Sequence, residues 1–290
     1  MGETKSTASP ALYLVATPIG NLEDITLRAL RVLKEVDLIA CEDTRQTQKL
    51  LNHYSISTRT TSYHEHNEVT KSSELAKQMR EGASVALVTD AGMPGISDPG
   101  YRLIVHAIEQ QIPVVPIPGA SAFLAALVAS GLPTDSFQFG GFIPAKRGER
   151  RATLEQIRTA PQPQLFYEAP HRLLETLRDI VEVLGTSRHI VVARELTKVH
   201  EEFLRGRAGE VLDTLKSRAA IKGEITLLIG KPDPEEAHVG TDALVRPTVR
   251  RRVQELMAQE KIDEKTALKR VAKERGVSKS EAYREMQRSR

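Results

Sequence analysis

The chain has 290 residues, of which 40% are hydrophobic and 27% are charged, as in ordinary globular proteins. It contains one cysteine, so an internal disulfide framework and a cysteine-rich zinc site are excluded, and a reducing, cytoplasmic location is expected. No apolar run approaches the roughly 20 residues of a membrane-spanning helix, and the N-terminus lacks the apolar core of a signal peptide, so no membrane partner is expected.

The net charge of +3 conceals an uneven distribution along the chain. Residues 246–290 hold 14 Lys and Arg against 7 Asp and Glu, whereas the rest of the chain is slightly acidic. A basic appendage on a nearly neutral body is typical of proteins that bind nucleic acid. The alternative to nucleic-acid binding is that these charges only form the solvent-exposed face of a helical segment.

Strand-like and helix-length segments alternate through the first part of the chain, after a leader over 1–10 that we expect to be disordered. The expected strands are Leu12–Ala16, Leu38–Cys41, Ser57–Ser62, Val85–Thr89 and Val114–Ile117. The expected helices are Ile25–Val36, Thr44–His53, Val69–Arg80, Tyr101–Gln110 and Ser121–Ala129. Because such alternation produces βαβ units, it predicts an α/β domain with a parallel sheet over 11–133.

A second α/β domain is predicted over 134–232, with strands that are shorter and carry more charge. The expected strands are Phe137–Phe142, Leu165–Glu168, Ile190–Ala193, Glu202–Arg205 and Glu224–Ile229. The expected helices are Arg150–Thr159, Arg172–Leu184 and Ala208–Ser217. Mixing of charge into the strands favours an antiparallel or mixed sheet.

The remaining residues form a predicted linker over 233–247 and a basic helical domain over 248–290. The sequence P-D-P-E-E, which begins at Pro232 and continues into the linker, disfavours regular structure. In the tail, Lys265–Glu274 has a helical pattern and is followed by a glycine turn, a serine cap and a second helical pattern. This order is that of a helix-turn-helix.

The segment V-T-D-A-G-M-P-G-I-S-D-P-G, Val88–Gly100, follows a predicted strand and precedes a predicted helix. Its glycines permit positive φ and a close approach of another molecule to the main chain. Ligands of open α/β sheets bind beyond the carboxyl ends of the strands, so this loop predicts a small-molecule site. The spacing is not G-x-G-x-x-G, which argues against a dinucleotide. Loops over Val15–Asp24 and Ile117–Ala122 end at the same sheet edge, although Ser121 also fits a simple helix N-cap.

Polar clusters follow several other predicted strands. They read C-E-D-T-R from Cys41, Y-H-E-H-N from Tyr63, Y-E-A-P-H-R from Tyr167 and A-R-E-L-T-K-V-H-E-E from Ala193. Ionisable groups gathered at strand ends favour a functional site, although each cluster alone is more typical of surface charge. The histidines of the H-x-H sequence lack an identifiable third ligand, so no metal site is predicted.

Taken together, these segments resemble the tetrapyrrole-methylase superfamily, the class III S-adenosylmethionine-dependent methyltransferases. The motifs that carry the resemblance are V-A-T-P-I-G-N-L-E-D-I-T, C-E-D-T-R, S-Y-H-E-H-N-E, V-T-D-A-G-M-P-G-I-S-D-P-G, P-G-A-S-A, G-G-F-I-P, Y-E-A-P-H-R and A-R-E-L-T-K-V-H-E-E. Members that modify corrins and porphyrins typically carry G-x-G-P-G-D in the first loop, where this chain has A-T-P-I-G-N. That difference points to the RNA-modifying branch.

The resemblance implies two α/β domains with the cofactor cleft between them, and a homodimer. It implies S-adenosylmethionine as cofactor and, as activity, 2′-O-methylation of a cytidine ribose in 16S rRNA, at the decoding centre of the small ribosomal subunit. The implied cofactor-binding residues are Asp90, Ala91, Gly92, Met93, Gly95, Ile96, Ser97, Ser121, Ala122, Tyr167, Leu196 and Glu224.

A ribose hydroxyl is a poor nucleophile, so a general base is expected. The catalytic candidates are Lys198, His200 and Glu42, with Glu168 as a further carboxylate. A lysine would need a lowered pKa to act as a base. The candidates for contacting RNA are Arg45, Arg147, Arg172, Arg194, Arg250, Arg251, Arg252, Lys269 and Arg270.

Two other functions remain open. The chain could be a superfamily member that methylates a protein or small molecule, of the diphthine-forming or corrin type, although the basic tail argues against it. It could also be a non-catalytic regulator in which a helix-turn-helix binds nucleic acid and the body senses a small molecule. A dehydrogenase is disfavoured because the dinucleotide fingerprint is missing.

Overall fold

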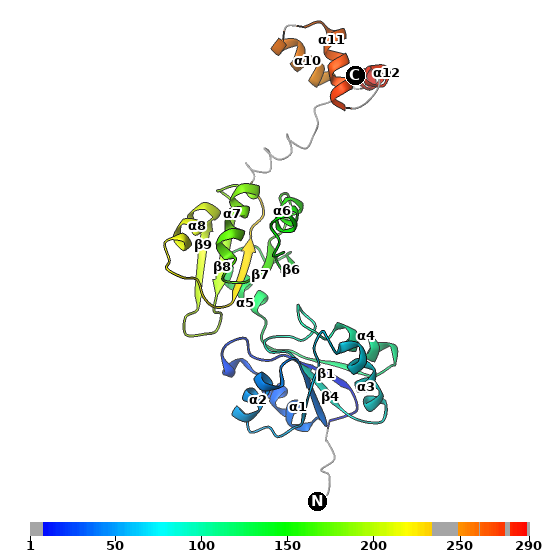
Figure 1. Cartoon of the computed structure of the whole chain (residues 1–290), viewed down its shortest axis with the longest axis vertical. Helices are drawn as coiled ribbons and strands as arrows, with labels where there is room; N and C mark the ends of the chain where they lie inside the picture. Colours follow the sequence, from blue (N-terminus) through cyan, green and yellow to red (C-terminus); the bar gives the residue numbers. More distant parts are fainter. Residues whose placement is uncertain (1–7, 234–248, 261, 276–278, 289–290) are drawn as a thin grey trace, which may run out of the picture. The chain divides into compact units, whose positions relative to one another are not determined.

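The computed structural model describes residues 8–233, 249–260, 262–275 and 279–288 (Figure 1). The chain divides into two units, residues 1–231 and 232–290. Most of the predicted leader over 1–10, nearly all of the predicted linker over 233–247 and the predicted turn at Gly276 lie outside the described residues.

The first sheet has five parallel strands in the order β3-β2-β4-β1-β5, which confirms the predicted parallel sheet. The strands are β1 Leu12–Val15, β2 Leu38–Cys41, β3 Thr60–Ser62, β4 Val85–Val88 and β5 Val114–Ile117. Every residue of β2 and β4 is buried. Continuous apolar strands of this kind are covered by helices on both faces.

Helices cover both faces of the first sheet. Side chains of α1 (Leu27–Glu35) and α2 (Thr44–His53) share one apolar cluster with the strands, and those of α3 (Glu68–Arg80) and α4 (Tyr101–Glu109) share the other. A 3₁₀ turn, η1 (Leu22–Asp24), precedes α1. Helix α1 begins two residues later than predicted because the Thr26 hydroxyl accepts a hydrogen bond from the Ala29 backbone and caps the helix there.

The second sheet is mixed, as predicted, with the order β6-β7-β10-β8-β9. Its strands are β6 Gln138–Phe142, β7 Gln164–Glu168, β8 His189–Arg194, β9 Glu202–Arg207 and β10 Ile225–Ile229. Strands β6 and β7 pair in parallel, and the other neighbours in this sheet are antiparallel. The α/β class expected from the sequence is therefore confirmed in both sheets.

One face of the second sheet packs against α6 (Arg147–Gln156), α7 (Leu173–Leu184) and α8 (Ala208–Lys216). Helix α6 begins at Arg147, three residues before the predicted start. The additional residues bring Arg147 to Asp179 of α7, with its Nε 3.0 Å from the carboxylate, and Arg150 Nη2 lies 2.7 Å from the same carboxylate. Both Arg150 and Asp179 are buried, so each neutralises the other's charge.

Helix α5 (Ala122–Ser130) covers the other face of the second sheet, although it follows β5 of the first sheet in the chain. Its Ala126 and Leu127 are buried together with Leu165, Val191 and Leu228 of the second sheet. The start of α5 therefore lies where the loops of the first sheet meet the second sheet. This packing joins the two sheets within the first unit of the chain.

The tail consists of three helices in its described part, α10 (Val249–Glu260), α11 (Glu264–Arg275) and α12 (Lys279–Arg288), which agrees with the predicted helical domain. Their buried core is small and is formed by Val249, Val253, Leu256, Ala267, Leu268, Val271, Ala272 and Ala282. Among the described residues, no helix has the length and apolar character needed to cross a lipid bilayer.

Candidate functional site

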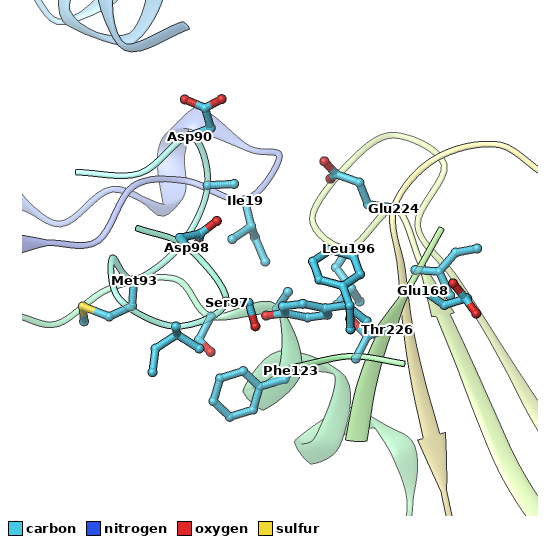
Figure 2. Close-up of a pocket in the computed structure, with 18 of the residues that line it drawn as sticks. Ile19, Asp90, Met93, Ser97, Asp98, Phe123, Glu168, Leu196, Glu224 and Thr226 are labelled. Atoms are coloured by element: carbon cyan, nitrogen blue, oxygen red, sulfur yellow. The ribbon is translucent and has the colours of Figure 1, made fainter. Parts of the chain in front are cut away.

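A cavity of about 470 Å³ lies between loops of the first sheet and strand ends of the second (Figure 2). The first sheet contributes Ile19, Glu42, Asp90, Ala91, Gly92, Met93, Ile96, Ser97 and Asp98. Helix α5 and the second sheet contribute Ser121, Ala122, Phe123, Phe142, Tyr167, Glu168, Ala169, Pro170, Leu196, Gly223, Glu224, Ile225 and Thr226. Its volume falls within the range of small-molecule and cofactor sites.

The loop after β4 is held in place by the loop after β1. The backbone of Thr17 exchanges two hydrogen bonds with Gly92, at 2.9 and 3.1 Å, and the Thr17 hydroxyl donates to the Thr89 carbonyl at 3.0 Å. Gly92 has a φ of +85°, and Ser97 has a φ of +62°. Left-handed backbone at a non-glycine residue costs energy and is concentrated at functional sites.

Three carboxylates meet at the first-sheet side of the cavity, those of Glu42, Asp90 and Asp98. Burial raises the pKa of each of them, and the negative charge of Asp90 raises the pKa of Glu42 further. The largest effect is at Asp98, where burial and then the charge of Glu42 raise the pKa to about 6. The Thr89 hydroxyl donates to Glu42 at 3.3 Å, which partly offsets the effect of burial there.

Aromatic rings form much of the opposite wall. Phe139 stacks on Phe123 with ring centroids 4.3 Å apart, and Tyr167 meets both Phe139 and Phe142 edge-on, at 5.0 and 5.5 Å. Burial raises the pKa of Tyr167 to about 12, so its hydroxyl stays protonated. The first-sheet side of the site is therefore acidic, whereas the opposite side is mainly apolar and aromatic and carries the carboxylates of Glu168 and Glu224 at its border.

A strained loop after β8 closes one border of the cavity. Glu195 and Thr197 both have positive φ, at +53° and +65°, and Leu196 between them lines the cavity. The Thr197 hydroxyl accepts a hydrogen bond from the Asn21 backbone at 3.1 Å, and a methyl group at Gly20 would come within 2.5 Å of Lys198 Cγ. This loop is thus packed directly against the loop after β1.

The structure brings together nearly all the residues that the sequence assigns to the cofactor. Eleven of the twelve line the cavity, and Gly95 alone is outside its lining. Figure 2 shows Asp90, Met93 and Ser97 on the loops of the first sheet and Leu196 and Glu224 on the side of the second sheet. Their assignment to the cofactor stays a prediction.

The surroundings of the catalytic candidates show which of them are suited to act as a general base. Lys198 pairs with Glu195 at 2.9 Å and with Glu224 at 2.7 Å, and these partners raise its pKa although burial opposes them, which argues against a base role. His200 is exposed and does not line the cavity. Glu168 is buried, accepts hydrogen bonds from Ala169 and Thr176, and forms an ion pair with Arg172. Its oxygens are therefore already engaged, which argues against a base role. Glu42 lines the cavity and therefore remains a candidate for the general base.

The arginines predicted to contact RNA are mostly engaged within the protein. Arg147 pairs with Asp179 and Glu182, Arg172 with Glu168, and Arg194 with Glu202 at 3.1 Å. Arg45 is largely exposed and pairs with Asp43. In the tail, Arg250, Lys269 and Arg270 are exposed and Arg252 is half-buried, whereas the Arg251 side chain lies outside the described residues. The exposed tail cations keep their predicted role as candidates.

Several side chains of the cavity were missed from the sequence, among them Asp98 and Phe142. Both lie within motifs that the sequence made conspicuous, D-A-G-M-P-G-I-S-D-P-G and G-G-F-I-P. The motif letters alone do not show which side chains face the cavity. No group of three or more metal-ligating side chains is found in the part of the chain that the structure describes.

Known proteins resemble this chain over most of its length. A family model described as Tetrapyrrole (Corrin/Porphyrin) Methylases matches residues 11–212. A protein of Halalkalibacterium halodurans named "Ribosomal RNA small subunit methyltransferase I" is 51% identical over 276 residues, covering 94% of this chain and 93% of its own. A protein of Escherichia coli O157:H7 with the same name is 49% identical over 234 residues, covering 80% of this chain and 82% of its own.

Solved structures resemble the fold at lower identity. The uroporphyrin-III C-methyl transferase of Thermus thermophilus, complexed with S-adenyl homocysteine, superposes with a TM-score of 0.53 at 19% identity. The match covers 79% of this chain and 99% of that protein. At this identity the likeness concerns the fold alone.

Proposed function

This chain belongs to the tetrapyrrole (corrin/porphyrin) methylase family and is an S-adenosylmethionine-dependent methyltransferase, and from that premise we propose that it methylates a cytidine ribose of 16S rRNA at its 2′-hydroxyl, at the decoding centre of the small ribosomal subunit. The resemblance predicted from the sequence motifs is thereby confirmed at the level of the family. An rRNA substrate is supported by the names of the relatives, and the first-loop sequence A-T-P-I-G-N, which differs from the G-x-G-P-G-D of corrin and porphyrin methylases, also favours RNA over a tetrapyrrole.

The observation that carries the proposal is the cavity, whose two sides suit the two halves of the cofactor. S-Adenosylmethionine carries a positive sulfonium and a positive ammonium group, beside one carboxylate, in its methionine part and a flat adenine ring at its other end. The carboxylates of Glu42 and Asp90 favour the positive charges, and the half-buried Tyr167 and the buried Leu196 favour the flat ring. Gly92, with its φ of +85°, leaves the main chain open to close approach.

When bound, the cofactor supplies a methyl group on a sulfonium, which is already a good leaving group. The remaining tasks for this chain are to orient the acceptor hydroxyl and to take its proton, and orientation alone can be worth about 7–11 kcal/mol. We assign the proton to Asp98, whose pKa of about 6 leaves it largely ionised at neutral pH yet basic enough to accept. Glu42 stands beside it and raises that pKa through its charge.

The function is tested by offering the protein labelled S-adenosylmethionine with three acceptors in parallel. These are small ribosomal subunits from a strain without the modification, free 16S rRNA, and the protein substrate of the diphthamide pathway. We expect label in RNA, at the 2′-oxygen of one cytidine. Label in the protein alone would reject the RNA proposal, and RNA binding without label in any acceptor would favour the non-catalytic regulator.

We expect the exposed tail cations to supply salt-dependent affinity for RNA in the cytoplasm, where ribosomal subunits are assembled. The variant Arg250→Gln/Lys269→Gln should raise the KM for the subunit, and its slope of log affinity against log salt should fall by about 1 for each phosphate that the tail no longer neutralises. The affinity for S-adenosylmethionine should not change. Titration at several salt concentrations measures both.

The matched control for the tail is Lys77→Gln/Arg80→Gln, which removes the same charge from the exposed surface of α3. If that variant alters the salt slope equally, the effect comes from net charge rather than from the tail. An unchanged slope in Arg250→Gln/Lys269→Gln contradicts the assignment.

We also propose a homodimer, formed through the outer surface of α5. The sequence of this helix, A-F-L-A-A-L-V-A-S, is apolar on every side, and such helices are ordinarily buried all round. Its inner side packs on the second sheet, yet Leu124 is 44% and Val128 74% exposed. We expect Leu124→Glu/Val128→Glu to sediment as a monomer, whereas Val69→Glu, at a similarly exposed site on α3, should leave the dimer intact. A wild-type protein that sediments as a monomer contradicts this.

A further inference from the structure

Phe142 is a large aromatic side chain that lines the cavity and is still 58% exposed. Ile96 of the loop after β4 also lines the cavity and is 40% exposed. Deeper in the same cavity, Leu196, Ile225 and Thr226 are buried. Phe142 and Ile96 therefore mark the mouth of the cavity, where two apolar surfaces face water.

The backbone is shaped to place Phe142 there. The pairing of β6 with β7 runs from Phe139–Leu165 to Phe142–Tyr167, so two residues intervene on β6 against one on β7. The extra residue is accommodated at Gly141, whose φ is +67°. Bulges of this kind turn the following side chain and are over-represented beside active sites. Here the bulge pairs Phe142 with Tyr167, and the two rings meet edge-on at 5.5 Å.

The same bulge lies against the loop that carries the cofactor candidates. A methyl group at Gly141 would come within 3.3 Å of the Ser97 hydroxyl, so β6 and the loop are in close contact. Ser97 itself has a positive φ of +62°, and it adjoins Asp98, the proposed proton acceptor. A nucleotide in contact with Phe142 would thus lie next to the loop that carries Ser97 and Asp98.

We propose that Phe142, with Ile96 beside it, forms a subsite for the base of the nucleotide to be methylated, which stacks on the exposed ring. This inference rests on the proposed function. A 2′-hydroxyl can reach a recessed cofactor only when its nucleotide leaves the RNA stack, and an extruded base needs a new stacking partner. Aromatic side chains supply this contact for single-stranded nucleic acid.

The exposed position of Phe142 indicates that its ring stacks on a base of the RNA rather than on the adenine of the cofactor. The acceptor is a macromolecule and arrives from outside, so its base meets the exposed mouth first. The buried interior around Leu196 and Thr226 is the part of the cavity that would hold the cofactor. Loss of the Phe142 ring should therefore impair the use of RNA without impairing the binding of S-adenosylmethionine.

The test compares Phe142→Leu and Phe142→Trp in the full-length protein, using unmodified small ribosomal subunits and labelled S-adenosylmethionine. We expect kcat/KM for the subunit to fall by about 10- to 100-fold in Phe142→Leu. Phe142→Trp should restore most of it, because a larger flat ring still stacks. Calorimetry should give the same affinity for S-adenosylmethionine in all three proteins, which also shows that the variants are folded.

Phe137→Leu is the matched control, since Phe137 is an exposed phenylalanine just before β6 that does not line the cavity. It should retain the kcat/KM of the wild type. A normal kcat/KM in Phe142→Leu overturns the subsite, and so does a loss of S-adenosylmethionine affinity as large as the loss of activity, which would place the adenine on this ring. A wild-type protein that methylates no RNA would refute the proposed function instead, and the two failures are therefore distinguishable.

Discussion

Replacing Asp98 with asparagine should lower kcat for methyl transfer by about 10²- to 10⁴-fold, which is the usual contribution of a general base. The amide has the size and shape of the carboxylate but cannot accept the proton of the ribose hydroxyl. The affinity for RNA should change little, because Asp98 is half-buried at the cavity and its role is confined to the reaction. Single-turnover kinetics with saturating cofactor and subunits measures the effect.

The pH profile provides a second, independent measure of the same residue. Asp98 accepts a proton only when it is ionised, and burial with the charge of Glu42 raises its pKa to about 6. Single-turnover rates of the wild type should therefore rise as the pH increases through about 6 and level off above it. Glu42→Gln removes a negative neighbour, so the pKa of Asp98 should fall and the rising part of the profile should move to lower pH.

Glu42→Gln also separates the two candidates for the base. If Glu42 is the base, this variant loses activity at every pH, and Asp98→Asn keeps a rising pH profile. Retention of near-normal kcat in Asp98→Asn would exclude Asp98 as the base. Asp213 of α8 is an exposed carboxylate that does not line the cavity, and Asp213→Asn serves as the control, for which we expect wild-type rates.

Replacing Gly92 with valine should weaken S-adenosylmethionine binding by about 10- to 100-fold and reduce RNA labelling accordingly. The φ of +85° at Gly92 is open to glycine but strained for a β-branched residue, at a cost of about 1–3 kcal/mol. The loop can relieve that strain only by giving up the paired hydrogen bonds between Gly92 and Thr17. Asp90, Ala91 and Met93, which line the cavity around it, would then move as well.

The control for Gly92→Val is Gly82→Val, which places the same side chain at another left-handed glycine. Gly82 follows α3 and has a φ of +103°, with no atom close enough to contact an added methyl group. Both variants should lose comparable thermal stability, because both strain the backbone. Only Gly92→Val should lose cofactor affinity in calorimetry. Equal cofactor affinity in the two variants would show that the loop after β4 does not hold the cofactor.

Much of the architecture could be predicted because local signals act over a few residues. Short apolar runs separated by helix-length segments specified the parallel sheet, and the clean end of β4 at Val88 placed the glycine-rich loop at the carboxyl edge. Helix starts were less accurate, since they depend on single contacts. The Thr26 cap delays α1, and the pairing of Arg147 with Asp179 of α7 extends α6 toward the N-terminus.

The chemistry of individual side chains could not be predicted in the same way. Lys198 looked like a base within its own segment, but Glu224, 26 residues further along, pairs with it and helps to raise its pKa. Glu168 looked like a free carboxylate at a strand end, but α7 supplies Thr176 and the turn before it supplies Arg172. Charges and hydrogen bonds act through space, so their effect is unknown until the chain has folded.

By itself, the sequence determined the two α/β sheets, the helical tail and the loops that border the cavity, because hydrophobic periodicity and glycine conformations are properties of neighbouring residues. The family was indicated by the resemblance of the loop motifs to those of known methylases. Only the tertiary structure decided that α5 packs on the second sheet, that burial raises the pKa of Asp98 while two carboxylate partners raise that of Lys198, and that a bulge at Gly141 presents Phe142 at the mouth. Each of these depends on burial and on partners distant in the chain, which local patterns do not encode.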